Sequence, residues 1–395
     1  MKKNFNLDKE LPESFVNELI NIRRHLHMYP ELSLSEYKTA EKIEEYLSAW
    51  NIPCERIAET GVLVVLEGNR PGKVVAIRAD IDALPIEEVQ DRPYRSKNDG
   101  VMHACGHDVH ATVLLGAAKA FKMMEGDFDG TVKFFFQPAE EASGGAKRMI
   151  QAGCMDNPKV DYVIGLHVMP QIETGKFEFG YNAFCAMSCA VKIKIKGKSG
   201  HAAKPCQAVD AVSIAGQVIT NLNMIVSRNV SPLDSVVLTF GSIHGGTKSN
   251  IIADEVILDG TLRTLSQEMK DVVAKKINDI ANHVASAHGA SVEVIIEEGY
   301  PALINDKTVV ENIIDVASDL VGVDNVQMIS APSMGGEDFS FFSNQVPSAF
   351  YNIGCGNIEK GITASLHNNA FDVDETCIPL GVKMQVKSAL ELMKS

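Results

Sequence analysis

Residues 131–137 read Thr-Val-Lys-Phe-Phe-Phe-Gln, a nearly continuous apolar run of strand length. A strand with one face in water alternates apolar and polar residues, whereas a continuous apolar run fits a strand buried on both faces. Similar runs occupy 61–66, 73–80 and 160–167, and segments with helical patterns at 15–26, 36–50, 109–124 and 146–152 alternate with them. This alternation predicts an α/β domain whose sheet is covered by helices on both faces.

The pattern changes between about residues 186 and 297. Apolar residues at 191, 193 and 195 alternate with lysines at 192, 194 and 196, the period of a strand with one solvated face. A helix (209–226), two strands (235–243, 255–264), a helix (267–288) and a strand (291–296) follow, giving the βαββαβ order of a ferredoxin-like domain. Helix and strand alternation then resumes at 307–321, 326–329, 348–353 and from 376. We therefore predict a discontinuous α/β catalytic domain, 1–185 and 298–395, with an inserted lid-sized domain, 186–297.

Composition and charge limit the classes of function. The chain has 395 residues, 45% hydrophobic and 22% charged, a balance typical of soluble globular proteins. Its net charge of −14, without a Lys/Arg-rich block, argues against a nucleic-acid or anionic-membrane partner. No run approaches the ~18 apolar residues of a membrane span, and residues 1–15 lack the apolar core of a signal peptide. With eight dispersed cysteines and no CxxC pair, the sequence predicts a reduced cytoplasmic protein.

The densest polar cluster is His103-Ala-Cys-Gly-His-Asp-Val-His110, just ahead of a predicted helix. Any one of its histidines alone is more simply explained as a helix cap or a solvent-facing side chain. Sulfur and imidazole at alternate positions together suit a borderline metal ion. Cys105 and His107 share a face if the loop is extended. His103 and His110 are assigned supporting or structural roles.

Three further segments carry candidate ligands: Gln137-Pro-Ala-Glu-Glu141 after a buried strand, Gly165-Leu-His167 at a strand end, and Leu366-His367 near the C-terminus. Ligands in α/β sheets collect at the carboxyl ends of strands. The candidate ligands are Cys105, His107, Glu141, His167 and His367. Five donors are enough for two divalent metal ions, with the Cys105 thiolate suited to bridge them. Zn, Mn, Co and Ni all suit such a set, and the set does not select among them.

These motifs, together with Arg78-Ala-Asp-Ile-Asp-Ala-Leu-Pro85, resemble the M20 family of metallopeptidases and amidohydrolases. The nearest branch is that of hippurate hydrolases, auxin-conjugate hydrolases and N-acetyl-diaminopimelate deacetylases. The resemblance implies that the five donors bind the metals, that Glu140 is the catalytic base, and that the subunit dimerises through the inserted domain. Two positions depart from the family pattern: Cys206 replaces a frequent lid histidine, and Asn368-Asn369-Ala370 lacks a usual proline.

Roles for other residues follow from this chemistry. Glu140 would take a proton from a metal-activated water and pass it to the leaving amine. Asp82 is expected to orient a ligand histidine, although a loop-capping aspartate fits nearly as well. In the inserted domain, His201 is expected to polarise the carbonyl oxygen, acting across a dimer interface. Asn250 and Arg263 are expected to grip a substrate carboxylate, the plain alternative for Arg263 being a solvated charge on a lid strand.

The predicted function is metal-dependent cleavage of the amide bond of N-acyl amino acids (N-acetyl, N-benzoyl or similar) or of short peptides with a free carboxylate. A dipeptidase or carboxypeptidase acting at the same site is the alternative. A thiol amidase with Cys105 as nucleophile would leave the two glutamates and His367 without a task. A non-catalytic metal-binding protein would not need Glu140. The acyl group itself cannot be inferred from the sequence.

Overall fold

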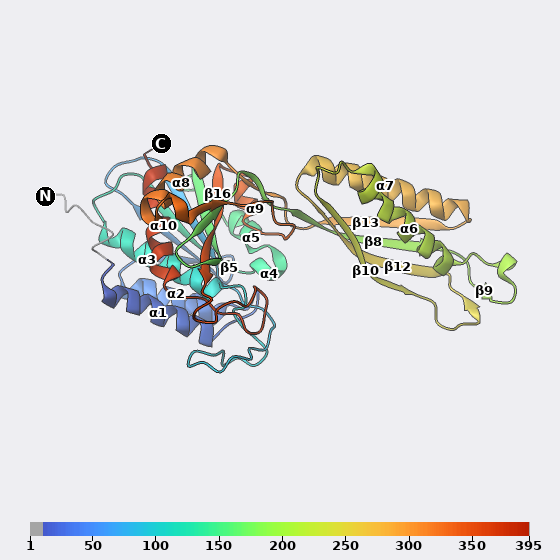
Figure 1. Cartoon of the computed structure of the whole chain (residues 1–395), viewed down its shortest axis with the longest axis horizontal. Helices are drawn as coiled ribbons and strands as arrows, with labels where there is room; N and C mark the ends of the chain where they lie inside the picture. The colour runs from blue at the N-terminus through green and yellow to red at the C-terminus, as the bar shows by residue number, and fades with distance from the viewer. Residues whose placement is uncertain (1–10, 395) are drawn as a thin grey trace. The chain divides into compact units, whose positions relative to one another are not determined.

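The computed structural model describes residues 11–394, which form two compact units (Figure 1). The first unit runs to Asn182 and also includes Ile304–Ser330 and the chain from Asp338 onward, and the second contains Ala183–Leu303 and Ala331–Glu337. The second unit therefore contains the predicted insertion and, in addition, a later stretch that no sequence pattern indicated. Residues 1–10 and 395, at the ends of the predicted catalytic domain, lie outside the described residues.

The first unit is built on an eight-stranded mixed sheet with the order β1-β2-β4-β3-β5-β16-β6-β15. Its strands are β1 (Cys54–Ile57), β2 (Gly61–Glu67), β3 (Val74–Asp80), β4 (Thr131–Gln137), β5 (Tyr162–Glu173), β6 (Phe177–Phe179), β15 (Val326–Met328) and β16 (Ser348–Gly356). Strands β4, β3, β5 and β16 are parallel neighbours, so their carboxyl ends point to one edge of the sheet. The predicted mixed α/β fold is confirmed.

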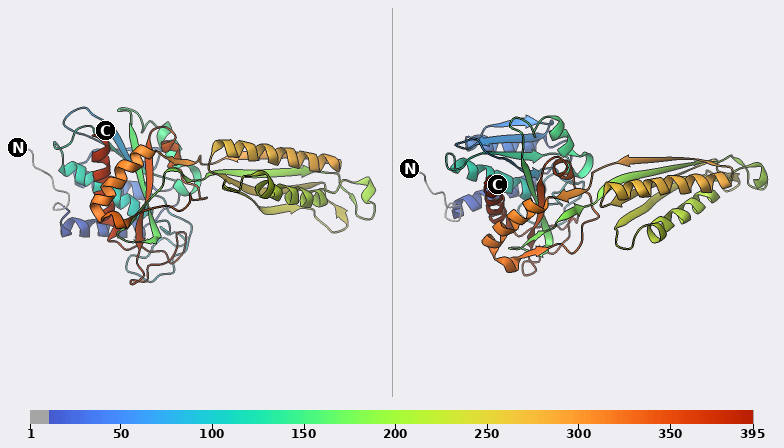
Figure 2. Two further views of the ribbon diagram at one scale, coloured as in Figure 1. Left: turned by 45° about the horizontal axis from the view of Figure 1, so that its top comes forward. Right: turned by 90° about the horizontal axis from the view of Figure 1, so that it is seen from above.

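Strand β4 shows why the sheet is covered on both faces. Phe134 contacts Phe121 of α3 (His107–Met123), and Phe135 contacts Phe342 of α9 (Ser340–Ser343), with ring centroids 5.9 and 5.4 Å apart. Successive side chains of a strand point to opposite faces, so consecutive phenylalanines need helices on both sides. The other helices of this unit are α1 (Glu13–Met28), α2 (Tyr37–Ala49), α4 (Glu140–Ser143), α5 (Gly145–Gln151), α8 (Lys307–Val321) and α10 (Cys377–Leu392). Figure 2 gives two further views of these layers.

The second unit has a four-stranded antiparallel sheet with the order β10-β12-β8-β13. Its elements follow the chain as β8 (Met187–Lys196), α6 (Ala211–Asn229), β10 (Val236–Gly245), β12 (Glu255–Thr264), α7 (Gln267–Ala287) and β13 (Ser291–Glu298). The apolar residues of β8 at 191, 193 and 195 are buried in this unit's core together with one side of each helix. The role of this unit as a lid or dimerisation domain stays a prediction.

Short elements complete the structure. Strands β9 (Gly200–His201) and β11 (Ile251–Ile252) pair in the second unit, and β7 (Asn182–Cys185) pairs with β14 (Leu303–Asn305). Two single-turn helices cover Pro205–Gln207 and Val323–Asn325. Within residues 11–394, no helix combines the length and apolar character needed to cross a membrane.

Candidate metal centre

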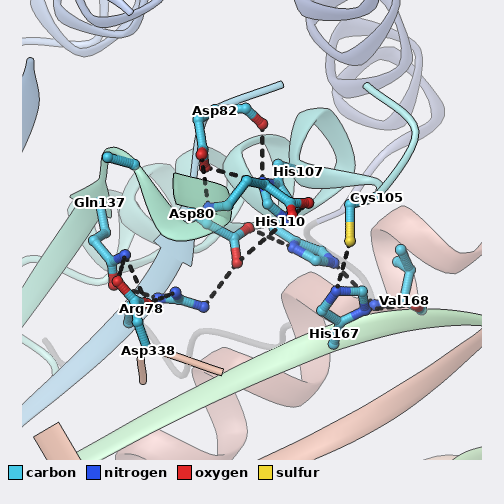
Figure 3. Close-up of polar contacts among 12 residues, drawn as sticks. Arg78, Asp80, Asp82, Cys105, His107, His110, Gln137, His167, Val168 and Asp338 are labelled. Atoms are coloured by element: carbon cyan, nitrogen blue, oxygen red, sulfur yellow. Dashed lines mark hydrogen bonds and ion pairs between the residues drawn. The ribbon is translucent and has the colours of Figure 1, made fainter. Parts of the chain in front are cut away.

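Arg78 holds the carboxyl ends of β3 and β4 together. Its buried guanidinium lies 2.7 Å from acceptors on Asp80, Gln137 and Asp338 (Figure 3). The amide of Gln137 in turn donates to both carboxylate oxygens of Asp338, each at 2.9 Å. Burial alone would raise the pKa of Asp80, but the neighbouring His107 and Arg78 hold that pKa well below its ordinary value. An ionised carboxylate therefore stands at the end of β3.

A tight turn at Gly106 brings Cys105 and His107 together, which corrects the prediction of an extended loop. Gly106 has φ +85°, and α3 begins at His107, two residues before its predicted start. A Cβ built on Gly106 would lie 2.3 Å from Cγ2 of Val168, so glycine suits both the left-handed backbone and the close approach. The left-handed turn, and not the two-residue period of an extended chain, directs both donors to the same place.

His107 and His167 present the same ring nitrogen to the site. Nδ1 of His107 lies 2.9 Å from the carbonyl oxygen of Asp82 and 3.2 Å from its carboxylate, so Nδ1 carries the proton. Nδ1 of His167 donates to the carbonyl oxygen of Val168 at 2.7 Å, while Nε2 lies 3.4 Å from Sγ of Cys105. Each ring thereby directs its Nε2 toward the site, where it can bind a cation once it carries no proton.

The position of His167 in its strand differs from the prediction. The sequence predicts that the strand ends at this histidine, but β5 continues to Glu173. The pairing of β3 with β5 stops at Gly165, whereas β16 continues to pair with β5 beyond His167. His167 thus lies two residues past the last pair of β5 with β3, level with Asp80 at the end of β3.

The two adjacent glutamates leave β4 through a fixed turn. Ala139, with φ +53°, places Glu140 and Glu141 at the start of α4. The N–H of Ala139 donates to the Glu36 carboxylate at 2.8 Å, and the N–H of Glu141 donates to the Asp82 carboxylate at 3.0 Å. Two buried carboxylates therefore hold the backbone on either side of Glu140.

His367 reaches the site from the loop after β16. Its N–H donates to the carbonyl oxygen of Ala104 at 2.8 Å, which places it beside Cys105, and its own φ is +59°. Oε1 of Glu141 lies 3.4 Å from Nε2 of His367 and 3.9 Å from Nε2 of His107. The adjacent Glu141 raises the pKa of His367 above its ordinary value.

The donor atoms form two groups that share Cys105. One group is Cys105, His107 and His167, the other is Cys105, Glu141 and His367, and within each group all donor atoms lie within 4.8 Å of one another. Glu140, which is buried, forms a third such group with His107 and Glu141. The structure thus brings together all five predicted ligands and the predicted base.

A divalent cation fits this donor set. Nε2 of His107 and Oε1 of Glu141 are buried, and neither makes a hydrogen bond of normal geometry with any described residue. Such unsatisfied atoms are costly, and a cation would satisfy both. Burial raises the pKa of the Cys105 thiol well above its ordinary value, an effect that a bound cation reverses.

The three residues predicted in the insertion lie in the second unit. His201 ends β9, and the N–H of Ala202 donates to the carbonyl oxygen of Asn250 at 3.1 Å, so His201 and Asn250 lie on neighbouring segments. Nδ1 of His201 accepts from the N–H of Ala203 at 3.0 Å, which leaves the ring proton on Nε2 of an exposed side chain. Arg263 lies on β12, its guanidinium 2.6 Å from a threonine hydroxyl of the same strand.

Sequence reasoning assigned supporting roles to Asp82 and His110 but missed other side chains that hold the candidate ligands in place. Arg78 and Asp80 belong to a motif that was recognised but given no role, and Asp338 comes from a glycine-rich loop far along the chain. The signal was present: an arginine and an aspartate inside an otherwise apolar strand are both buried, and buried charges need partners. Glu36 gave no such signal, because it sits in an ordinary amphipathic segment.

Borderline donors at the carboxyl edge of a largely parallel α/β sheet, next to a buried carboxylate, define the class of the protein: a metal-dependent hydrolase. The chain belongs to peptidase family M20/M25/M40, whose model matches residues 76–391. The resemblance noted in the sequence is thereby confirmed, and the protein is a hydrolase of C–N bonds.

Relatives named as amidohydrolases, deacetylases or peptidases are similar to this chain over most of its length. The chain is 39% identical over 380 residues to an N-acetyl-L-cysteine deacetylase of Bacillus subtilis, covering 96% of this chain and 89% of that protein. It is 44% identical over 299 residues to an N-acyl-L-amino acid amidohydrolase of Geobacillus stearothermophilus, covering 75% and 80% of the two chains. The crystal structure of the YXEP protein of Bacillus subtilis, described as a dinuclear metal-binding peptidase from the M20 family, matches with a TM-score of 0.86 at 31% identity, covering 97% of this chain and 99% of that one.

Proposed function

We propose that this protein uses two divalent metal ions to cleave the amide bond of N-acyl amino acids, N-acetyl, N-benzoyl or similar, or of short peptides with a free carboxylate. The observation that carries the proposal is that two donor groups share Cys105, with the buried Glu140 beside them. The relatives named as an N-acyl-amino-acid amidohydrolase and an N-acetylcysteine deacetylase support this substrate class.

The residues of the first unit divide the chemistry among them. The metals, held by Cys105, His107, Glu141, His167 and His367, would supply an acidified water and polarise the carbonyl group. Glu140 takes the proton of the attacking water and delivers it to the leaving nitrogen. Glu141 lies between His107 and His367 and is therefore committed to binding. Asp82 keeps His107 in the tautomer whose Nε2 can act as a ligand.

The second unit supplies the contacts to the substrate. Nε2–H of His201 donates to the carbonyl oxygen as negative charge develops on it, since Nδ1 already accepts a backbone N–H. Asn250, on the neighbouring segment, and Arg263 bind the substrate carboxylate. We propose that the enzyme is a homodimer in which His201 of one subunit serves the metal centre of the other. A histidine that serves the same chain's centre is the alternative.

A thiol amidase is disfavoured by the surroundings of Cys105. The thiolate is the nucleophilic form of cysteine, and burial raises the pKa of this thiol. Cys105 is also common to both donor groups, the place of a bridging ligand. A dipeptidase or carboxypeptidase would use the same residues and differ only in the acyl group, so substrates must separate these reactions.

The decisive experiment starts from chelator-treated protein, reloaded separately with Zn, Mn, Co or Ni. A panel of N-acetyl, N-benzoyl and aminoacyl amino acids, each as free acid and as amide, is then ranked by kcat/KM. We expect activity only after reloading, the highest kcat/KM for N-acyl substrates, and a preference for free acids that Arg263→Ala removes. Cys105→Ser should lose metal and activity, whereas Cys206→Ser, at an exposed thiol, is the matched control. Full activity without bound metal would refute the proposal, and faster cleavage of aminoacyl substrates would identify a dipeptidase.

A further inference from the structure

His110 lies among the candidate ligands although it is not one of the five. It is completely buried on α3, one helical turn after His107. Its ring centroid is 5.4 Å from that of His107 and 4.6 Å from that of His167, the latter with the rings at 69°. With Asp80 and His107 it also forms a group of donor atoms within 4.8 Å (Figure 3). Proximity alone would therefore allow His110 to be a ligand.

The hydrogen bonds of His110 exclude that role. Its Nδ1 lies 2.6 Å from a carboxylate oxygen of Asp80, which is held ionised by Arg78 and can only accept. Its Nε2 lies 2.9 Å from the backbone nitrogen of Val168, which can only donate. Nδ1 must therefore carry the proton and Nε2 must use its lone pair, so neither nitrogen remains for a cation.

The same contacts connect His110 to a candidate ligand. The peptide that joins His167 to Val168 presents its N–H to Nε2 of His110, and Nδ1 of His167 donates to the carbonyl oxygen of Val168. Two hydrogen bonds and an edge-on ring contact thus fix both the backbone and the imidazole of His167. Asp80 therefore holds His110, and His110 in turn holds the backbone beside the candidate ligand His167.

We infer that His110 is a positioning residue that orients His167 for metal binding through the Val168 backbone. This inference rests on the proposed function, because it assigns His167 to a metal. It makes a specific claim about the two nitrogens: the bond from Val168 to Nε2 orients the ligand, whereas the bond from Nδ1 to Asp80 fixes the tautomer. Loss of such a support typically lowers metal affinity 10–100-fold.

Three substitutions separate the contacts. His110→Gln places an amide oxygen near the position of Nε2 and can still accept from Val168. His110→Asn places an amide nitrogen near the position of Nδ1 and can donate to Asp80 only. His110→Phe keeps a ring of similar size and loses both hydrogen bonds. We expect affinity for one of the two ions to fall in the order wild type, Gln, Asn, Phe, by about 10–100-fold at the end of the series.

The measurement is titration of metal-free protein with Co²⁺, following the visible absorption of the bound ion and the number of ions per chain. The second readout is the nitrogen NMR spectrum of the metal-free protein, which should show His110 protonated on Nδ1 alone. Urea unfolding of each metal-free variant shows whether it is folded. His27→Gln is the matched control, since His27 is a buried histidine bonded to Asp108 that contacts neither His107 nor His167 through any described hydrogen bond.

The outcomes separate this inference from the proposed function. Wild-type protein that binds fewer than two ions would refute the proposed function and this inference with it. Two ions in the wild type, with unchanged affinity in all three His110 variants, would overturn the positioning role alone. An Asn variant that binds as tightly as the Gln variant, or an equal loss at both ions that tracks lower stability in urea, would overturn it as well. Protonation of His110 on Nε2 would do the same.

Discussion

Glu140 and Glu141 are neighbours in the chain, yet they meet different surroundings. Glu141 lies between two candidate ligand histidines, while Glu140 is a buried carboxylate anchored by backbone contacts on both sides. Glu140→Gln should keep both metals and lose at least about 100-fold in kcat, the usual contribution of a general base. Glu141→Gln should lower metal occupancy as well. Metal analysis and steady-state kinetics on the dialysed proteins test both, and near-normal turnover in a folded Glu140→Gln protein would contradict the assignment.

Arg78 neutralises two buried carboxylates, those of Asp80 and Asp338. Arg78→Met would remove the cation from both and leave them only hydrogen bonds from groups such as His110 and Gln137. Breaking a buried ion pair from one side costs about 3–5 kcal/mol. Urea unfolding of the metal-free variant, where metal binding adds nothing to stability, measures this loss. Arg70→Met is the control: Arg70 pairs with Asp129 on the surface, where water and salt screen the interaction, so its unfolding midpoint should not change. Equal midpoints for both variants would show that the buried pairs do not stabilise the fold.

At the level of elements, the turn between α4 and α5 allows no added atom. A Cβ built on Gly145 would lie 1.6 Å from the carbonyl oxygen of Pro138, and the N–H of Gly145 already donates to the carbonyl oxygen of Ala139. Gly145→Ala must therefore move the segment that carries the two glutamates. A displacement of about 1 Å in a catalytic group can cost about 100-fold in rate, and overpacking about 1–3 kcal/mol in stability.

We accordingly expect Gly145→Ala to lower kcat at least about tenfold in protein that still folds. Gly216→Ala is its control, because Gly216 lies inside α6 with open space around it. That change should raise stability by about 0.5–1 kcal/mol through helix propensity and leave the kinetics unchanged. Wild-type kcat in the Gly145 variant would mean that the turn adapts without moving the glutamates.

Local sequence patterns were sufficient to predict the regular helices and strands, but they could not predict contacts between residues that are distant in sequence. The strand at 255–264 and the helix at 307–321 have the bounds that the sequence predicts, because periodicity and caps are properties of a few consecutive residues. The two-residue strands β9 and β11 are too short to show any period. The turn at Gly106 was mistaken for an extended loop, since a single left-handed residue leaves no periodic signal.

The same distinction between local patterns and contacts through space applies to the residues of the candidate site. Its ligands stand in compact motifs with distinctive residue types, and so the sequence could nominate all five. Of the residues that support them, Asp82 could be nominated from its motif. The ion pair of Arg78 with Asp338 could not be, because these residues are 260 positions apart and meet only after folding. The roles of the ligands and of Glu140 stay predictions until metals and kinetics are measured.

On the scale of the whole chain, buried ions tie distant segments together. Arg23 of α1 is completely buried, its Nε lies 2.8 Å from Asp108 of α3, and its other nitrogens lie 3.3 Å from Asp372 and Glu375, just ahead of α10. Asp108 follows a candidate ligand, His107, in sequence, and Asp372 lies on the chain that leads on from another, His367. The first helix and the C-terminal segment therefore share one charged core beside the metal centre.

The residues proposed for catalysis come from both units of the chain. All five candidate ligands and Glu140 belong to the first unit, whereas His201 belongs to the second. We expect His201 to serve the partner subunit's metal centre. A subunit with His201→Ala keeps an intact metal centre, and a subunit with Glu140→Gln keeps an intact His201, so a mixed dimer contains one complete site.

Random exchange of subunits from the two inactive variants should make about half of the dimers mixed and restore about a quarter of the wild-type activity. If His201 instead serves its own chain, every site in the mixture carries one lesion and no activity returns. Mixing differently tagged variants and recovering the mixed dimer by both tags shows that exchange has taken place. The double variant, with both lesions in one chain, mixed with wild-type protein is the complementary test. If His201 serves the partner, both sites of that mixed dimer carry a lesion, whereas if it serves its own chain the wild-type subunit keeps one complete site. Recovered mixed dimers of the single variants without activity would establish that His201 acts within its own subunit.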